Sequence, residues 1–420
     1  MTEKVPRRAQ YGAKRMMDGQ DGKPVTIPMQ YPRTVGPNAV RYLTEFAESG
    51  LIVDMIGRFE KAFAEELGVK HCIATPGCTP ALAALAAAFQ FEPGDEIITS
   101  PISDYGTIQG LFREGFIPIF ADAAPGTVNL SAETIEPLIT DRTRAILAVH
   151  MTGIVCDMDP INELAEKHGL IVYEDCCQAT FSEYKGRLAG TLCKAAGFSF
   201  DSEKAMGSDI GGCVVTDDDD LAEAVLFHGQ SRGGEMVEGF GRMHTSPGYA
   251  YRMPHCTAAI CLAQLEIIRD QIYQRDKMVR LLTSLIGDIP GLTPVPIPDY
   301  QDTYSCWAFG FSLQPGEFDC SNVEFAAEVQ EGGVPMADVG TMYLMPASMA
   351  FLEDYARAGR YPFSKPPASR DYTYSAESCP NAAEYLKHWV YWPTFCEKYT
   401  EETCEAAAAI VADVAERHRQ

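Results

Sequence analysis

The stretch Val172–Gly212, VYEDCCQATFSEYKGRLAGTLCKAAGFSFDSEKAMGSDIGG, contains the residues around which the chain is organised. An apolar run from Leu170 to Tyr173 is followed by the acid Asp175. A second apolar run, from Ala195 to Phe200, is followed by Lys204. Both runs are typical of short buried strands. Strands that end at the same edge of a parallel sheet would bring the carboxylate and the amine into one cleft.

A carboxylate and a lysine in one cleft suit a cofactor with a ring nitrogen at one end and an aldehyde at the other. A lysine amine forms a Schiff base with an aldehyde, and an ionised carboxylate such as Asp175 keeps a ring nitrogen protonated. The pattern predicts pyridoxal phosphate as the cofactor, with Gln178 placed to hydrogen-bond its phenolic oxygen. Taken singly, a lysine in the position of Lys204 is more often a surface residue, and Asp175 is better explained as the cap of the following turn. Gln178 could simply pack.

Composition places the chain among globular proteins. Its 420 residues are 46% hydrophobic and 22% charged, with a formal net charge of −24, which argues against binding to nucleic acid or to anionic membranes. No apolar run is long enough to cross a membrane, and the basic N-terminus has no apolar core of the kind that a secretory signal needs. The 14 cysteines form no CxxC pair, which favours reduced thiols over structural zinc. A cytoplasmic protein without a metal is expected.

Short apolar runs alternate with helical segments from residue 69 onward, which predicts an α/β fold. Seven runs read as strands: 71–75, 96–100, 117–121, 144–150, 170–173, 195–200 and 213–216. The alternation favours a mostly parallel sheet covered by helices on both faces, a three-layer αβα domain.

Three units are predicted along the chain. Residues 1–35 read as an N-terminal arm, 36–285 as a large cofactor-binding domain, and 286–420 as a smaller α+β domain. Within the large domain, helical patterns over 38–66 and 257–286 each suggest one long helix, with Gly68 ending the first. The glycine-rich stretch 229–248 is expected to be a long loop.

The stretch Thr75–Pro80, TPGCTP, predicts a phosphate-binding cup. Gly77 allows a close approach of the backbone, Thr79 is a natural N-cap, and Pro80 suits a first helical turn. The free N–H groups at that helix start, at Cys78 and Thr79, would bind a phosphate dianion. A purely structural helix start explains the same residues.

Tyr105 follows the predicted strand that ends near Pro101. Its ring could stack on one face of a cofactor, and it could equally be a core tyrosine.

Together these residues resemble the DegT/DnrJ/EryC1/StrS family of sugar aminotransferases. The resemblance lies in the stretches 68–85 (GVKHCIATPGCTPALAAL), 94–101 (GDEIITSP), 173–179 (YEDCCQA), 198–204 (FSFDSEK) and 248–266 (GYAYRMPHCTAAICLAQLE). It implies pyridoxal-phosphate enzymes of fold type I that are homodimers.

The resemblance also implies a role for each matching residue. Lys204 is the lysine that bonds to the cofactor aldehyde, and it carries a proton between substrate and cofactor. Asp175 pairs with the ring nitrogen and Gln178 with the phenolic oxygen. Ser199, with the N–H groups of Cys78 and Thr79, binds the phosphate.

Several positions depart from the family pattern. The cup reads Gly77-Cys78-Thr79 where Ser-Gly-Thr is usual, and Ala250 replaces an asparagine that reaches the cofactor of the neighbouring subunit. Ile210 stands where an acid is usual, and Trp307 lies near a family histidine. These departures bear chiefly on the substrate side of the site.

The sequence therefore predicts an aminotransferase that moves an amino group from glutamate or glutamine to a keto group of a nucleotide-linked sugar or a cyclitol. One alternative is a non-catalytic, cofactor-binding regulatory protein of the same fold, suggested by Gly77, Ile210 and Ala250. A second is a sugar dehydratase. Lys204 argues against the dehydratase, because the related dehydratases carry histidine there. The sequence does not specify the acceptor or the carbon aminated.

Overall fold

The computed structural model describes residues 25–234, 236–339, 343–364, 368 and 370–420. Its centre is a seven-stranded sheet. In spatial order the strands are β1 (His71–Thr75), β10 (Gly212–Thr216), β9 (Ala196–Ser199), β6 (Ile171–Asp175), β5 (Thr143–Val149), β2 (Glu96–Thr99) and β4 (Ile117–Phe120). Strand β10 runs antiparallel to β1 and β9, and the other neighbours are parallel. The predicted mostly parallel sheet of seven strands is confirmed.

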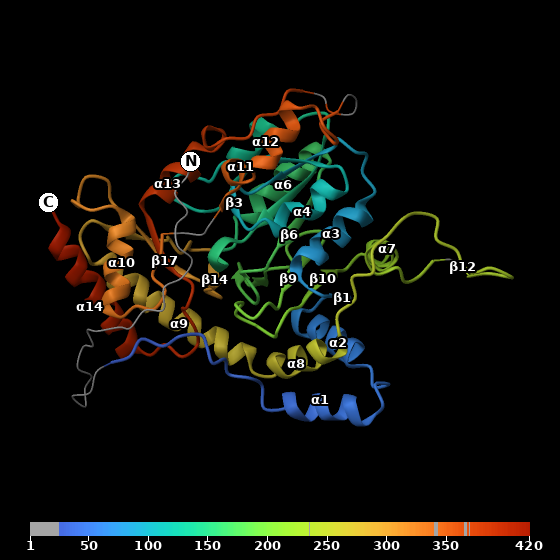
Figure 1. Ribbon diagram of the computed structural model, residues 1–420, viewed down its shortest axis with the longest axis horizontal. Helices are drawn as coiled ribbons and strands as arrows, with labels where there is room; N and C mark the ends of the chain where they lie inside the picture. Colours follow the sequence, from blue (N-terminus) through green and yellow to red (C-terminus); the bar gives the residue numbers. More distant parts are fainter. Residues whose placement is uncertain (1–24, 235, 340–342, 365–367, 369) are drawn as a thin grey trace.

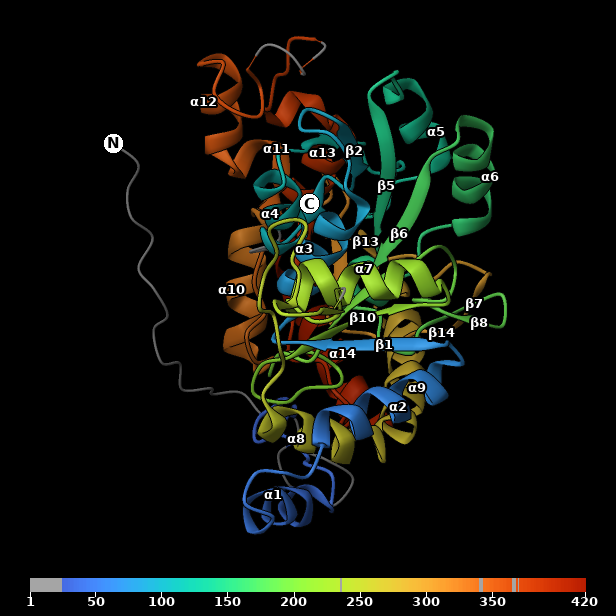
Figure 2. The ribbon, with the colours of Figure 1, turned by 90° about the vertical axis from the view of Figure 1, so that its right-hand side faces the viewer.

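Helices cover both faces of this sheet (Figures 1 and 2). They are α2 (Met55–Leu67), α3 (Cys78–Phe89), α4 (Gly106–Arg113), α5 (Ala132–Ile135), α6 (Met158–His168), α7 (Asp219–Gln230) and α8 (His255–Leu265). Successive side chains of a strand point to opposite faces. On β9, Gly197 faces Leu82 of α3, whereas Phe198 packs edge-on against Phe63 of α2, with ring centroids 5.3 Å apart. The predicted three-layer α/β fold is confirmed.

The helix next to the predicted phosphate cup is buried almost all round. Helix α3 consists mainly of alanine and leucine, and its buried residues run without a gap from Ala81 to Ala88. It packs between the sheet and the helices α4 and α7. A helix that is apolar on every side belongs in a core, so its first turn is held rigidly at the sheet edge where strands β1, β6 and β9 end.

Two helical predictions were wrong in length. The pattern over 38–66 forms α1 (Ala39–Glu48) and α2, because Gly50 and Leu51 take left-handed backbone angles and Asp54 then caps α2. The pattern over 257–286 forms α8 and α9 (Ile268–Gly287), interrupted at Ile267. Gly68 ends α2 in the left-handed conformation, as predicted.

The C-terminal part of the chain carries its own sheet. Strands β13 (Leu292–Pro294), β15 (Phe309–Leu313) and β17 (Trp389–Trp392) are antiparallel, and α10 (Asn322–Gly332), α13 (Pro380–His388) and α14 (Glu401–His418) accompany them. A separate small sheet joins β14 (Gln301–Thr303) to β7 (Glu183–Tyr184) and β8 (Arg187–Leu188) of the large domain. Mixed helices and antiparallel strands match the α+β composition expected of this region.

Part of the region predicted as the small domain contacts elements of the region predicted as the large domain. Strand β16 (Tyr343–Leu344) pairs with β3 (Ile102–Ser103), and the helices α11 (Met345–Ser348) and α12 (Ala350–Arg357) follow it. Arg370 then forms an ion pair with the fully buried Glu96 of β2. The boundary at 285/286 stays a prediction.

Side chains form hydrogen bonds with outward backbone groups on both edge strands of the central sheet, β1 and β4. On β1 the outward N–H of Ala74 donates to Glu60 Oε1 (2.8 Å), and the outward carbonyl of Ala74 accepts from Gln230 Nε2 (2.6 Å). On β4 the carbonyl of Pro118 accepts from Tyr374 Oη (2.9 Å). The outward polar groups of Ala74 and the Pro118 carbonyl are thus hydrogen-bonded without a further strand.

A hairpin projects from the body after α7 (Figure 1). It carries β11 (Met236–Val237) and β12 (Gly241–Arg242) within the stretch predicted as a long loop. Two of its apolar side chains are largely exposed to solvent, Phe240 by 81% and Met236 by 71%. In the described part of the chain, no helix is long and apolar enough to cross a membrane.

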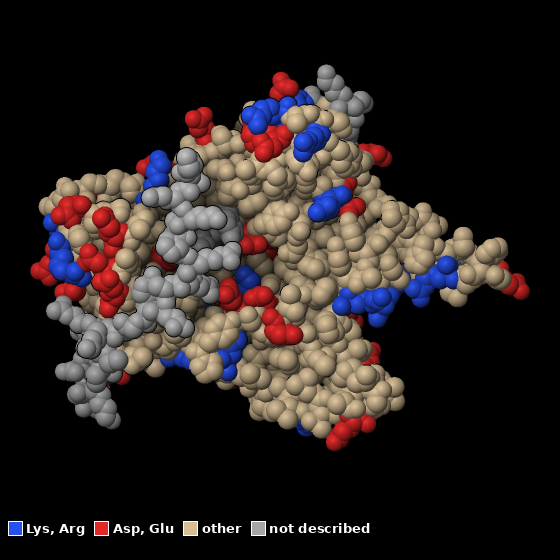
Figure 3. Space-filling model, in the orientation of Figure 1, with Lys and Arg blue, Asp and Glu red and all other residues tan. Residues whose placement is uncertain are grey.

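Charge is distributed unevenly over the surface. On the face shown in Figure 3, acidic side chains gather over the region of α10 and α14, and basic ones line the lower side of the projecting hairpin. The net charge of −24 is thus compatible with local basic surfaces.

Candidate active site

A cavity of about 390 Å³ opens at the sheet edge where β1, β6 and β9 end. Its wall is formed by Pro76, Gly77, Cys78, Thr79, Pro80, Leu82, Asp104, Gly106, Thr107, Asp175, Cys177, Ser199, Asp201, Glu203, Lys204, Ile210 and Gly211. Six of the eight predicted site residues are in this wall, and Gln178 and Tyr105 are not. Since the carboxyl ends of parallel strands meet at one edge, residues far apart in sequence converge here.

The predicted cup is the first turn of α3. The helix begins at Cys78 with Gly77 as its N-cap, so the prediction that Thr79 is the N-cap was wrong. The N–H groups of Cys78 and Thr79 belong to the first turn, where no preceding turn offers a carbonyl. Unbonded N–H groups at a helix start, together with the helix dipole, are suited to an anion. Gly212 packs so closely behind the cup that an added Cβ would lie 2.3 Å from the carbonyl carbon of Gly77.

Asp175 is buried at the end of β6, with 1% of its surface exposed. Its Oδ2 accepts from Thr107 Oγ1 (2.9 Å), and its Oδ1 accepts from the backbone N–H of Cys177 (3.1 Å) and more weakly from Cys78 Sγ (3.7 Å). No lysine, arginine or histidine within the described ranges forms an ion pair with Asp175. A buried carboxylate without a cationic partner is suited to receive a protonated ring nitrogen.

Cys78 is the first residue of α3 and lines the cavity at the cup. A hydrogen bond to Cys177, burial, and the charge of Asp175 together hold the pKa of the Cys78 thiol well above its ordinary range. The thiol is therefore neutral at physiological pH and acts as a weak hydrogen-bond donor rather than as a nucleophile.

Gln178 lies just behind the cavity wall and is 5% exposed. Its Oε1 accepts the N–H of Thr152 (2.7 Å), which fixes the orientation of the carboxamide. Thr152 has a left-handed backbone with φ of 58°, a costly conformation for a β-branched residue. The carbonyl of Thr152 in turn accepts the backbone N–H of Trp307 (2.9 Å).

Ser199 is the last residue of β9 and is 5% exposed. It pairs with Gly212 across the ladder, which places it next to the cup. Its Oγ lies 3.3 Å from the N–H of Asp201 and lines the cavity. A hydroxyl beside a helix start is a fitting partner for a phosphate oxygen.

Lys204 lies in the turn after β9 and lines the cavity. The backbone N–H of Lys204 donates to the carbonyl of Asp201 (3.0 Å). The side-chain Nζ of Lys204 lies over the ring of Trp307, 4.5 Å from its centroid. A helix start, a buried unpaired carboxylate and an amine thus border one cavity, which fits the phosphate, ring nitrogen and aldehyde of pyridoxal phosphate.

Tyr105 lies beside the cavity rather than in its wall. It is the N-cap residue of α4 and is 38% exposed, and its ring packs edge-on against Phe351, with centroids 5.9 Å apart. The prediction that Tyr105 stacks on a cofactor stays a prediction.

Several contacts at the site were missed by the sequence interpretation. Thr107 bonds to Asp175, and Trp307 covers Lys204. Gln30 and Arg33, in the predicted arm, bond to the backbone of the lysine turn. Residues 1–24 of that arm lie outside the described residues. The departure at Trp307 was the one local signal that pointed to any of these residues.

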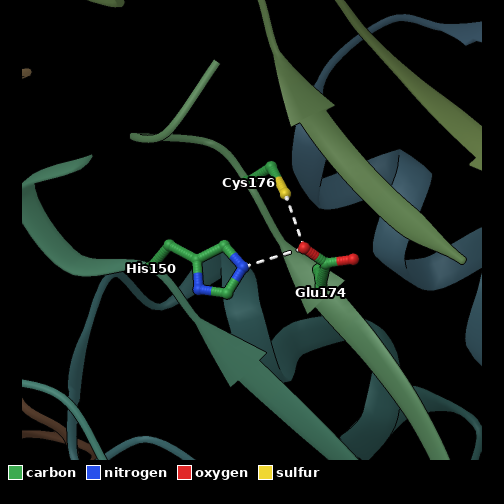
Figure 4. A group of neighbouring side chains, drawn as sticks. All are labelled: His150, Glu174 and Cys176. Carbon is green, nitrogen blue, oxygen red and sulfur yellow. Dashed lines mark hydrogen bonds and ion pairs between the residues drawn. The ribbon is translucent and has the colours of Figure 1, made fainter. Parts of the chain in front are cut away.

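Next to Asp175 on β6, Glu174 points to the opposite face of the strand and meets His150 and Cys176 (Figure 4). Both its oxygens are occupied, since they also accept the backbone N–H groups of Gly190 (2.7 Å) and Leu192 (3.0 Å). His150 Nδ1 accepts the N–H of Cys156, which leaves the ring proton on Nε2, facing Glu174. A metal would need that nitrogen, so this fully buried group is structural and fixes the strand that presents Asp175.

Comparison with known proteins gives the family. The model of the DegT/DnrJ/EryC1/StrS aminotransferase family matches residues 35–411. A GDP-perosamine synthase from Caulobacter vibrioides is 38% identical over 258 residues, which cover 60% of this chain and 68% of that protein. An L-glutamine:2-deoxy-scyllo-inosose aminotransferase from Streptomyces paromomycinus is 31% identical over 326 residues, covering 73% and 76%.

A solved structure agrees with these sequence matches. That of 3-amino-5-hydroxybenzoic acid synthase superposes with a TM-score of 0.81 at 25% identity, covering 94% of this chain and all of that one. The fold is that of the fold-type-I enzymes, which use pyridoxal phosphate. The chain is a pyridoxal-phosphate-dependent aminotransferase and belongs to the DegT/DnrJ/EryC1/StrS family.

Proposed function

We propose that this enzyme moves an amino group from glutamine or glutamate to a keto group on a nucleotide-linked sugar or a cyclitol. The names of its relatives support both the proposed donor and the proposed acceptor, since one relative makes GDP-perosamine and another uses L-glutamine with an inosose. The observation that carries the proposal is the placing of Asp175 and Lys204 on one cavity, beside the free helix start of α3.

Each site residue has a proposed task. Asp175 pairs with the protonated ring nitrogen, and Gln178 donates to the phenolic oxygen. Ser199 and the N–H groups of Cys78 and Thr79 hold the phosphate, with Gly77 giving the backbone room. Tyr105 covers one face of the ring.

When bound, pyridoxal phosphate withdraws electrons from the substrate carbon that bears the nitrogen. The rest of the work belongs to the protein. Lys204 bonds to the aldehyde between turnovers and, once released, carries a proton at its Nζ to and from the reacting carbons as a general acid and base. Asp175 would keep the ring cationic, because its carboxylate is buried and forms no ion pair with another side chain in the part of the chain that the structure describes.

We propose a homodimer as the working form. The hairpin 236–242 extends from the body with Phe240 and Met236 bare, and exposed apolar side chains of this kind fit a partner surface. Arg242 lies in this hairpin and Arg232 lies four residues before it, and these two guanidinium groups on a second subunit could meet an anionic substrate. Ala250 lacks the side-chain amide of an asparagine, so a contact between this position and a second subunit differs from the one that an asparagine would make.

A cytoplasmic location is also proposed. All 14 cysteines are unpaired, and unpaired, mostly buried thiols are usual in a reducing compartment.

The function is tested by the spectrum of the cofactor-loaded protein. Adding glutamine or glutamate should convert the pyridoxal form to the pyridoxamine form, and adding a keto-sugar nucleotide or a keto-cyclitol should convert it back. Lys204→Arg, which retains the charge and cannot form the Schiff base at this position, should abolish the lysine-bonded absorbance. Lys194→Arg is the matched control, because that exposed lysine pairs with Asp218 away from the cavity. A normal spectrum in Lys204→Arg would refute the assignment, and no response to any donor would favour the regulatory alternative.

A further inference from the structure

Trp307 is the aromatic residue that faces the amine of Lys204. The two residues come from different parts of the fold, Lys204 from the turn after β9 and Trp307 from the segment before β15, and Nζ lies 4.5 Å from the ring centroid. We propose that Trp307 is a positioning residue that holds the Lys204 amine whenever this amine is not bonded to the cofactor. The inference rests on the proposed role of Lys204.

The indole ring itself is fixed. Its Nε1 donates to the carbonyl of Glu203 (3.0 Å), the residue before the lysine, and its backbone N–H donates to the carbonyl of Thr152 (2.9 Å). Thr152 donates in turn to Gln178 (2.7 Å). One connected set of bonds therefore links the ring that faces Lys204 to the residue proposed to contact the phenolic oxygen.

The backbone of the lysine turn is held from the other side by the segment before α1. Gln30 Nε2 donates to the carbonyls of Glu203 (2.9 Å) and Lys204 (3.2 Å). Arg33 donates to the carbonyls of Ser202 (2.9 Å) and Ala205 (2.8 Å). Because the backbone is fixed at four consecutive carbonyls, Lys204 can change position only by rotating its side-chain bonds.

A weak acceptor for the free amine suits a lysine that must leave the cofactor and return. The cavity wall also contains Asp201 and Glu203, and a carboxylate in direct contact with the ammonium would hold it more firmly than a ring face does. The face of Trp307 attracts the cation without bonding a proton to it. It thus keeps the amine close and releases it at little cost.

The proposal predicts a difference between two forms of the cofactor. Pyridoxal phosphate bonds to Lys204 and so removes the amine from the indole ring of Trp307. Pyridoxamine phosphate cannot bond to Lys204 and leaves the contact between the amine and the indole ring intact. Removing the ring should therefore favour the bonded state. In Trp307→Leu, the ratio of the affinity for pyridoxal phosphate to that for pyridoxamine phosphate should rise about 10-fold, the range of a partly desolvated cation–π contact.

The experiment measures both affinities by titrating the cofactor-free full-length protein. Trp307→Phe retains a ring face without the N–H donor, and its ratio should rise much less than that of Trp307→Leu. Gln30→Met is the control for the backbone contacts, because it removes donors to Glu203 and Lys204 and leaves the ring. Its ratio should not rise.

Two results would overturn the proposal. An unchanged or lowered ratio in Trp307→Leu, with affinity for pyridoxamine phosphate retained, would mean that the ring does not hold the free amine. If Trp307→Leu fails to fold, Trp307→Met, which also removes the ring, replaces it, and an unchanged ratio in that variant would mean the same. Borohydride reduction with peptide mass analysis tests separately whether Lys204 bonds to the cofactor. If the cofactor label is absent from Lys204 in the parent protein, both the proposed function of Lys204 and the proposed role of Trp307 are refuted. If the label is on Lys204 and the affinity ratio is unchanged in Trp307→Leu, only the role of Trp307 is refuted.

Discussion

Replacing Glu60 by glutamine should make the protein more stable at neutral and alkaline pH. Burial raises the pKa of the Glu60 carboxyl from its ordinary value of 4.5 to about 7, although the hydrogen bond from the Ala74 N–H opposes the rise. Between these two values the folded chain binds more protons than the unfolded chain. The free energy of unfolding therefore falls as the pH rises from about 4.5 to about 7, and the full loss of stability persists at higher pH.

The size of the effect follows from the gap between the two pKa values. At 1.36 kcal/mol for each pH unit, the gap from 4.5 to about 7 corresponds to about 3 kcal/mol of lost stability. Glutamine keeps the oxygen that accepts the Ala74 N–H and carries no charge at any pH. Glu60→Gln should therefore be more stable than the parent protein by about 1 kcal/mol at pH 5 and by about 3 kcal/mol at pH 8.

Urea unfolding of the cofactor-free protein at pH 5, 6.5 and 8, with linear extrapolation to water, measures this gain. Glu65→Gln is the matched control on the same helix, since Glu65 is largely exposed and pairs with Lys61. The control should keep the pH dependence of the parent protein. If Glu60→Gln also keeps it, the carboxyl does not titrate near neutrality and the reasoning fails.

Two further substitutions probe the cavity. Thr107→Val removes the hydroxyl that donates to Asp175 (2.9 Å) and should weaken pyridoxamine phosphate binding about 10-fold, as measured by titration; an unchanged affinity would show that this hydroxyl does not support the carboxylate. Gly212→Ala places a Cβ 2.3 Å from the carbonyl carbon of Gly77 and should cost about 1–3 kcal/mol with weaker cofactor binding. Gly287→Ala, whose added Cβ would meet nothing closer than 3.8 Å, is its control in thermal unfolding, and equal midpoints for the two variants would contradict the clash.

The sheet could be predicted from the sequence because its signal is local. Each strand is a short apolar run between turn residues, and the placement of Asp175, Ser199 and Lys204 around one cavity follows from the rule that parallel strands end at one edge. Helix lengths were harder to predict, because an amphipathic pattern continues through a break. The break between α1 and α2 depends on two residues in a left-handed conformation, Gly50 and Leu51, which apolar spacing does not reveal.

The supporting contacts of the site could not be predicted because they join distant parts of the chain. Gln30 meets the carbonyl of Glu203 across 173 positions, and Thr107 meets Asp175 across 68. Hydropathy patterns give the faces of elements, whereas these pairs depend on how whole elements pack. The expectation that Thr79 caps α3 was wrong because the helix begins two residues before Pro80, at Cys78, with Gly77 as its cap.

The closed edges of the central sheet bear on how this protein meets other chains. An unprotected edge strand invites a strand from another molecule, which leads to edge-to-edge growth and aggregation. Here Glu60 and Gln230 occupy the outward groups of Ala74 on β1, and on β4 Pro118 has no N–H to offer while Tyr374 occupies its carbonyl. β-Strand addition is therefore blocked at these positions on both edges.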